Sequence, residues 1–254
     1  MKLKLLSGNV LKIIAAIFMV VDHVGLMFFP TLKILRILGR LSFPIFAFMI
    51  SEGARYTKNK VKYFSLLASL AAVCQIVYYV AMRSLYMCIL VSFSISVLLI
   101  YLLQLVKKKM FDKDTRPIVK MLLILAFFAS LAAVYMINTP SFTKATGIQI
   151  DYGFFGITVP LFASLFDFRE IDVPESIAKL DSIYTRIGCI AIALILLALD
   201  INNGIQGYAL LTLPILLLYS GKRGKANMKY FFYVFYPLHL VALEGIYMLV
   251  SLMK

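Results

Sequence analysis

Residues 10–29 read VLKIIAAIFMVVDHVGLMFF, an apolar run in which only Lys12, Asp22 and His23 are polar. A membrane-spanning helix needs about 20 mainly apolar residues, since each residue adds only ~1.5 Å across a hydrocarbon core ~30 Å thick. The apolar part of a secretory signal peptide is shorter, about 7–15 residues. Phe-Phe-Pro at positions 28–30 stands where a small-residue cleavage site would be. We therefore expect a retained membrane helix.

The rest of the chain has the same character. It has 254 residues, of which 62% are hydrophobic, and its mean hydropathy is +0.93. Soluble domains are only about 45–50% apolar. No polar loop approaches the ~50 residues of a separate domain. We predict one all-α membrane domain over residues 1–254.

Nine apolar segments make up this predicted bundle. They lie near residues 10–29, 34–54, 61–82, 85–106, 118–137, 152–167, 184–200, 205–220 and 230–252. The prediction is a polytopic transmembrane helix bundle of about nine spans. The sixth and eighth segments are short enough to be re-entrant or buried within the bundle.

The formal net charge of +14 is explained by loops on one side of the membrane. The cations cluster in three alternate loops: Arg55, Lys58, Lys60 and Lys62; Lys107, Lys108, Lys109, Lys113, Arg116 and Lys120; and Lys222, Arg223, Lys225 and Lys229. Cytoplasmic loops carry the excess of Lys and Arg. The pattern predicts a multi-pass plasma-membrane protein with a cytoplasmic N-terminus and an external C-terminus, and it needs no nucleic-acid partner.

Ionisable residues within the predicted helices mark a candidate site. Each costs about 2.5–3.5 kcal/mol on insertion scales, so each needs a physical reason. The two histidines of the chain, His23 and His239, both fall in predicted helices. Asp22, His23 and Arg40 fall in the outer half of their helices, and His239 falls near mid-membrane.

Four further residues complete the predicted substrate-binding set with Arg40. Asp151 and Tyr152 lie at the outer end of the sixth segment, and Glu52 lies towards the cytoplasmic end of the second. Tyr236 is three residues before His239 and therefore shares its helix face. Pro237 between them frees a backbone carbonyl, as suits a helix that lines a cavity.

Each polar residue has a structural alternative to a functional role. Asp22 and Arg40 are expected to form an ion pair. The pair would either join two helices or orient the residues of the candidate site. His239 either completes the site or forms an interhelical hydrogen bond. For His23 we favour chemistry, because imidazole takes and returns a proton near neutral pH. The three cysteines lack metal-ligand spacing, so we predict no metal site.

Four stretches resemble motifs of the TraX family of membrane proteins, in the same order and over nearly the whole chain. They are LKIIA with VDHV at 11–24, GRLSFPIFAF at 39–48, DYGFFG at 151–156 and FYVFYPLHL at 232–240. Each is weak alone, but together they are specific.

The resemblance implies an acyltransferase. The named member of the family acetylates the N-terminus of a conjugative pilin, and the family is distantly similar to membrane enzymes that acylate cell-envelope sugars. Acetyl-CoA would then be the acyl donor, and the acceptor a peptide N-terminus or an envelope glycan. His23, Asp22 and His239 would be catalytic, with His23 acting as general base or carrying the acyl group.

Two other functions are compatible with the same residues. Intramembrane Asp, Glu and His also form the proton relays of proton-coupled transporters. A non-catalytic factor that assembles surface structures is the third reading. Transfer of label from acetyl-CoA separates the first reading from both others.

The charge pattern predicts the sidedness of each loop. Reporters fused after Met110 and Lys225 should give cytoplasmic signals, whereas fusions after Arg83 and Ala145 should give external ones. Paired alkaline phosphatase and fluorescent-protein fusions measure this in whole cells. A cytoplasmic signal at Ala145, or an external one at Lys225, would contradict the nine-span topology.

Overall fold

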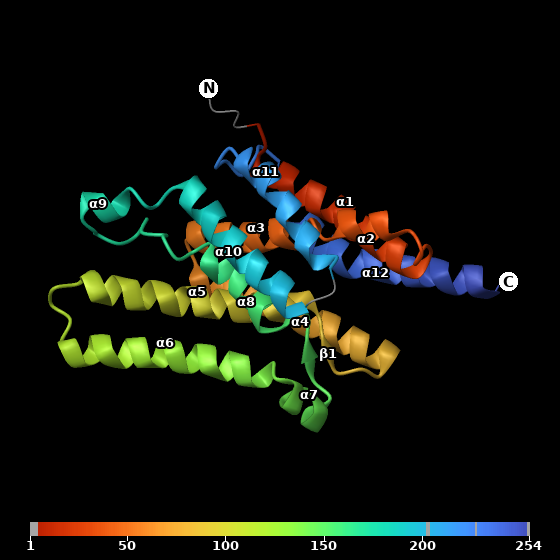
Figure 1. Cartoon of the computed structure of the whole chain (residues 1–254), viewed down its shortest axis with the longest axis horizontal. Helices are drawn as coiled ribbons and strands as arrows, with labels where there is room; N and C mark the ends of the chain where they lie inside the picture. Colours follow the sequence, from red (N-terminus) through yellow and green to blue (C-terminus); the bar gives the residue numbers. More distant parts are fainter. Residues whose placement is uncertain (1–4, 202–203, 227, 253–254) are drawn as a thin grey trace. The chain divides into compact units, whose positions relative to one another are not determined.

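The computed structural model describes residues 5–201, 204–226 and 228–252, and these are almost entirely helical (Figure 1). Its elements are α1 (Gly8–Met27), α2 (Lys33–Gly39), α3 (Ser42–Tyr56), α4 (Lys60–Met82), β1 (Tyr86–Met87), α5 (Ile89–Phe111), α6 (Pro117–Ile137), α7 (Pro140–Thr146), β2 (Gln149–Ile150), α8 (Gly153–Phe162), α9 (Glu175–Ala178), α10 (Ile183–Ile201), the 3₁₀ helix η1 (Gln206–Leu211), α11 (Thr212–Leu217) and α12 (Lys229–Leu252).

Seven helical segments of the described chain are long and apolar enough to cross a bilayer. They are Gly8–Met27, Lys33–Tyr56, Lys60–Val80, Ile89–Phe111, Pro117–Ile137, Ile183–Ile201 and Val234–Leu252. Two shorter apolar helical segments, Gly153–Phe162 and Gln206–Leu217, correspond to the sixth and eighth predicted segments. The all-α prediction is confirmed, with seven spans of full length where the sequence predicted about nine.

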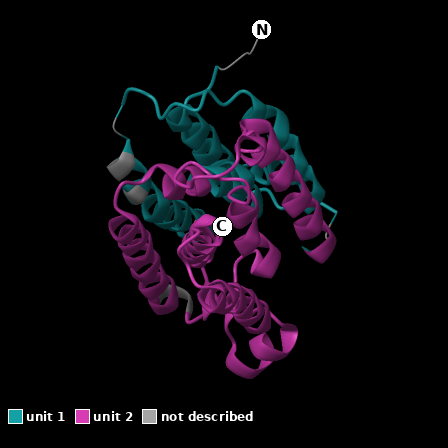
Figure 2. Ribbon diagram, turned by 90° about the vertical axis from the view of Figure 1, so that its left-hand side faces the viewer, with its two compact units in different colours: residues 1–49, 201–254 teal, residues 50–200 magenta. Residues whose placement is uncertain are grey.

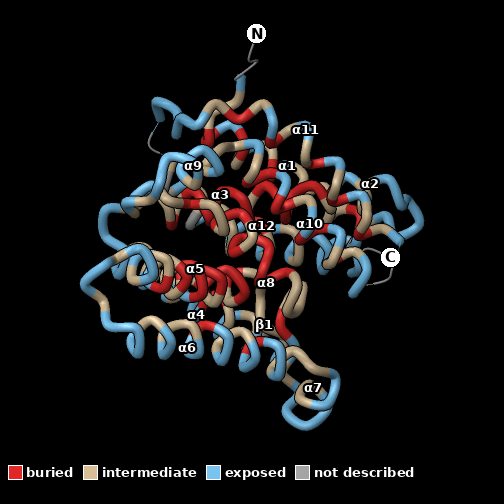
Figure 3. The backbone as a smooth tube through the Cα atoms, turned by 60° about the vertical axis from the view of Figure 1, so that its left-hand side comes forward, coloured by how far each residue is buried: buried red, intermediate tan, exposed pale blue. Residues whose placement is uncertain are grey.

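The chain divides into two units, coloured separately in Figure 2. Unit 1 comprises Met1–Met49 and Ile201–Lys254, and unit 2 comprises Ile50–Asp200. Each unit has its own buried residues, and Figure 3 colours the buried residues of the chain red. The assignment of residues 1–254 to one domain stays a prediction.

The second predicted span is two helices, not one. α2 ends at Gly39 and α3 begins at Ser42. Pro44 explains the break, because proline has no N–H to donate to the carbonyl four residues earlier and its ring crowds that carbonyl. That carbonyl belongs to Arg40. In the first turn of α3 the missing N–H costs nothing, since N–H groups there have no partner within the helix.

In unit 1, α1 and α2 pack closely at two glycines. A Cβ added at Gly25 would lie 2.7 Å from the Leu35 Cβ, and one added at Gly39 would fall on the Asp22 carboxylate. The start of α3 is held to α1 by Ser42, whose hydroxyl donates to the Ala15 carbonyl at 2.8 Å. Small residues therefore bring the α2 backbone within reach of the polar end of α1.

The basic segment before α12 folds over the N-terminal end of α1. The Gly8 and Asn9 N–H groups donate to the Lys222 and Arg223 carbonyls at 2.8 and 2.9 Å. The Asn9 side chain also donates to the Ala226 carbonyl at 2.6 Å. N–H groups at the start of a helix have no partner within it, so these bonds satisfy donors that would otherwise be left unpaired.

In unit 2, α5 is the central helix, with α4, α6 and α8 packed against it. Two serines join α5 to the α8 segment: Ser92 donates to the Asp151 carbonyl at 2.8 Å, and Ser96 donates to the Ile157 carbonyl at 2.6 Å. The pairing of β1 with β2, parallel and in the register Tyr86 to Gln149, was not predicted. It holds the two chain segments that precede α5 and α8 side by side.

Replacement of Gly39 by alanine should destabilise unit 1. The new methyl group would overlap the Asp22 carboxylate, and overpacking of this kind costs about 1–3 kcal/mol. Thermal unfolding of the detergent-solubilised protein measures the loss. Gly188→Ala in α10 is the matched control, because nothing lies within 4 Å of its added Cβ. Equal unfolding midpoints for both variants would contradict the close packing at Gly39.

Candidate functional site

The Asp22 carboxylate is shared by two arginines of the α2 segment. Arg40 Nη2 donates to both carboxylate oxygens, at 2.9 and 2.8 Å. Arg36 Nη1 lies 2.7 Å from Asp22 Oδ2 and donates to the Asp22 main-chain oxygen at 3.1 Å. All three side chains are mostly buried. The predicted Asp22–Arg40 pair is confirmed.

Gln206 extends this cluster to the 3₁₀ helix. Its Oε1 accepts a hydrogen bond from Arg40 Nη1 at 3.4 Å, and its side chain is buried. The adjoining α11 is anchored in the same region, since the Thr212 hydroxyl donates to the Leu41 carbonyl at 3.3 Å. The Arg40 guanidinium is therefore held from two elements, which fixes where its positive charge lies.

The two histidines of the chain meet. The His23 and His239 rings lie edge to face, with centroids 5.2 Å apart, so α1 and α12 are neighbours. His239 is buried, with 7% of its surface exposed. It stacks on Phe235 at 5.1 Å and contacts the edge of Tyr236 at 5.7 Å.

Each imidazole is oriented by its own helix backbone. His23 Nδ1 lies 2.7 Å from the Met19 carbonyl, and His239 Nδ1 lies 3.0 Å from the Phe235 carbonyl. A carbonyl oxygen only accepts, so Nδ1 is the donor in both rings, and in a neutral imidazole of this tautomer Nε2 holds the lone pair. His239 Nε2 is buried without a hydrogen-bond partner among the described residues. No hydrogen bond in the described chain joins Asp22 to His23.

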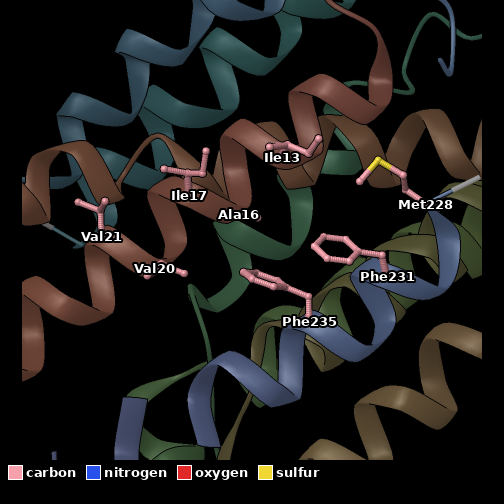
Figure 4. Close-up of a pocket in the computed structure, with 8 residues that line it drawn as sticks. All are labelled: Ile13, Ala16, Ile17, Val20, Val21, Met228, Phe231 and Phe235. Carbon is pink, nitrogen blue, oxygen red and sulfur yellow. The ribbon is translucent and has the colours of Figure 1, made fainter. Parts of the chain in front are cut away.

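An apolar groove runs along α1 beside the histidines. Its lining residues are Ile13, Ala16, Ile17, Val20 and Val21 of α1 with Met228, Phe231 and Phe235, and its volume is about 410 Å³. Figure 4 shows the Phe231 and Phe235 rings facing the α1 side chains across it. We call it the α1–α12 groove. Neither histidine lines it, but Val20 and Phe235 lie one turn before His23 and His239 on their helices.

Asp151 and Tyr152 lie in unit 2, where α8 begins. The Tyr86 hydroxyl donates to Asp151 Oδ1 at 2.6 Å. Burial and the negative charge of Asp151 raise the pKa of Tyr86, so its hydroxyl stays protonated and donates throughout the neutral range. Tyr152 has φ +59°, a left-handed conformation that is uncommon for a residue with a side chain. The hydrogen bond from the Asp151 N–H to the Met87 carbonyl helps hold this turn.

Glu52 also lies in unit 2, and its carboxylate is bound by Arg186 of α10. Both side chains are buried. The same guanidinium donates to the Ala163 carbonyl at 2.9 Å and to the Ser51 hydroxyl at 3.2 Å. The structure therefore gives Glu52 a partner that joins α3 to α10. A role in substrate binding stays a prediction.

Comparison with known families gives the chain its class. The sequence profile described as TraX protein matches residues 7–247. The chain belongs to the TraX family. All eight predicted site residues fall inside the matched range, and the apolar helices agree with a multi-pass membrane protein.

This TraX chain also matches an individual protein over a shorter stretch. A Rickettsia prowazekii (strain Madrid E) protein named "Uncharacterized protein RP591" is 48% identical over 54 residues. The match covers 21% of this TraX chain and 21% of that relative, so the chain spans about a fifth of the relative's length. No solved structure matches.

Sequence reasoning missed several polar residues that hold this TraX chain together. The role of Arg36 could have been predicted, since it lies four residues before Arg40 and so on the same face. The role of Arg186 could have been predicted too, because it is a charged residue within an apolar segment. Nothing in the sequence indicates the roles of Gln206 and Tyr86, because their partners come from distant parts of the chain. Among the described residues, no cluster of three or more His, Cys, Asp or Glu side chains fits a metal ion.

Removal of the Asp22 charge should destabilise the α1–α2 pair strongly. Asp22→Asn leaves Arg36 and Arg40 adjacent and uncompensated, and breaking a buried ion pair in this way costs about 3–5 kcal/mol. Denaturation of the purified protein in detergent measures this. Asp22→Asn combined with Arg40→Gln should recover part of the loss, because it removes one of the repelling cations. No recovery in the double variant would argue against direct coupling.

Proposed function

We propose that this protein is a membrane-embedded acyltransferase that moves an acetyl group from acetyl-CoA to an amine or hydroxyl of an exported or cell-envelope substrate. The observation that supports it best is the contact between His23 and His239, each with Nδ1 tied to a backbone carbonyl. In their neutral form the two imidazoles offer Nε2 lone pairs within one unit, His239 buried and His23 partly buried. Each of these residues lies in one of the TraX-like motifs of the sequence.

The chemistry needs a base and then an acid. The acceptor N–H or O–H gives its proton to an imidazole Nε2 as its nitrogen or oxygen attacks the thioester carbonyl. The C–S bond breaks, the C–N or C–O bond forms, and the imidazolium returns the proton to the thiolate of CoA. His23 takes the part of the base, and His239 Nε2, which lacks a partner among the described residues, assists the same proton transfer.

The charged residues around the histidines act as supports in this proposal. Asp22 positions α1 through its two arginines, so that the adjacent His23 is presented to α12. Arg40 stabilises the negative charge that builds up on the reacting carbonyl, because a guanidinium remains charged at every accessible pH. Tyr236 contacts the His239 ring and closes one side of the site.

The donor carries phosphates and therefore needs cations. Two of the basic loops fit, residues 107–120 and residues 222–229. In the first of these, Lys107 is already hydrogen-bonded to the Ser164, Leu165 and Asp167 carbonyls, so the exposed Lys108, Lys113 and Arg116 are the cations that could meet the donor phosphates. The second cluster offers the exposed Lys222, Arg223 and Lys225. Asp151, Tyr152 and Glu52 remain proposed substrate-binding residues of unit 2.

Replacement of His23 should abolish transfer. Membranes that contain the His23→Ala protein should move no label from acetyl-CoA to an acceptor and release no CoA thiol. His239→Ala should slow both by about 10²–10⁴-fold, the usual contribution of a positioned acid or base. Leu26→Ala on the same helix, an exposed position, is the control and should keep full activity.

Other outcomes separate the alternatives. Full transfer by a folded His23→Ala protein would refute the assignment. Loss of the unfolding transition in that variant would give His23 a structural role. Proton-coupled uptake by proteoliposomes, with no acyl transfer by the wild-type protein, would instead support the transporter reading.

A further inference from the structure

The α1–α12 groove has the chemistry of a hydrocarbon site. All eight residues that line it are apolar, and none offers a side-chain hydrogen bond. Its volume of about 410 Å³ lies in the range of about 300–1,000 Å³ that is typical of ligand pockets. A thioester arm with buried amide groups would leave those groups without partners, at a cost. An alkyl chain leaves nothing unpaired.

The length of the groove matches the depth of one leaflet. It extends along α1 from Ile13 to Val21, which is ~12 Å at ~1.5 Å per residue. One leaflet contributes about half of the ~30 Å hydrocarbon thickness. Because α1 is long and apolar enough to span the bilayer, a groove along its axis lies parallel to the chains of the surrounding lipids. A lipid chain enters it without a change of direction.

Positive charge gathers at one end of the groove. Lys12 precedes the lining residue Ile13, and its Nζ lies 5.7 Å from the Phe232 ring centroid, beside the lining residue Phe231. The exposed Lys222 and Arg223 belong to the segment that is hydrogen-bonded over the start of α1. No acidic residue lies in the first turn of α1 or in the described part of the 220–228 segment. This end therefore attracts an anion.

We propose that the α1–α12 groove binds one acyl chain of an anionic phospholipid, with the lipid phosphate at Lys12 and the 222–225 segment. The far end of the chain then contacts Phe235, which stacks on His239. The lipid fills the apolar space between α1 and α12, on the Lys12 side of the histidine pair. This site is independent of acyl transfer, and it holds whether or not the histidines are catalytic.

Native mass spectrometry of the protein released from detergent tests the site directly. Wild-type protein should retain one phosphatidylglycerol in preference to phosphatidylcholine with the same chains. Lys12→Gln should weaken phosphatidylglycerol retention by about fivefold, the share of one cation near a lipid surface, and leave phosphatidylcholine unchanged. Ile17→Trp should remove both lipids by filling the groove. The position is 57% exposed, so the ring is tolerated.

Matched variants outside the groove serve as controls. Leu125→Trp on α6 adds the same ring at a position that is 58% exposed, and Lys108→Gln removes an exposed cation from another helix. Both should retain phosphatidylglycerol like the wild type. Equal retention of the two lipids by the wild type, or no loss in Ile17→Trp, would overturn the proposal.

Discussion

One aspartate shared by two arginines organises unit 1. A lone carboxylate within the membrane would cost several kcal/mol, and Asp22 avoids that cost by facing both Arg36 and Arg40. The contact requires the α2 backbone to approach α1 closely, which the absence of a side chain at Gly39 permits. Two cations and one anion leave one positive charge, and Gln206 hydrogen-bonds the Arg40 side of the cluster. Polar pairing therefore helps to set how α1 and α2 are aligned.

The histidine pair depends on a different kind of constraint. Each ring is tied to the backbone carbonyl four residues earlier in its own helix, so neither needs the aspartate to fix its tautomer. The two sets of polar groups therefore have different roles. The Asp22–Arg36–Arg40 cluster holds α1 against the α2 segment, and the helix backbone orients each imidazole. In the proposed acyl transfer, an imidazole held in this way would present its Nε2 without first having to reorient, as a positioned base requires.

Much of this arrangement could be predicted from the sequence. The parts that could not be predicted have physical reasons. Apolar length locates the helices, because hydrocarbon thickness is a strict constraint. The cost of buried charge is enough to predict that Asp22 pairs with Arg40. The break at Arg40 could have been predicted from Pro44, although the second segment was predicted as one helix. The β1–β2 pair and the Tyr86–Asp151 bond were not readable, because they join segments more than sixty residues apart.

The sequence Val21-Asp22-His23 shows how one helix serves three purposes. Successive helical residues point about 100° apart, so three neighbours must face three directions. Val21 lines the α1–α12 groove, Asp22 meets the arginines of the α2 segment, and His23 contacts His239 of α12. A rotation of α1 that improved one contact would worsen the other two. The ion pair on one side therefore fixes the rotation that brings the histidine to its partner and the valine to the groove, which gives a physical reason for these three residue types to stand next to one another.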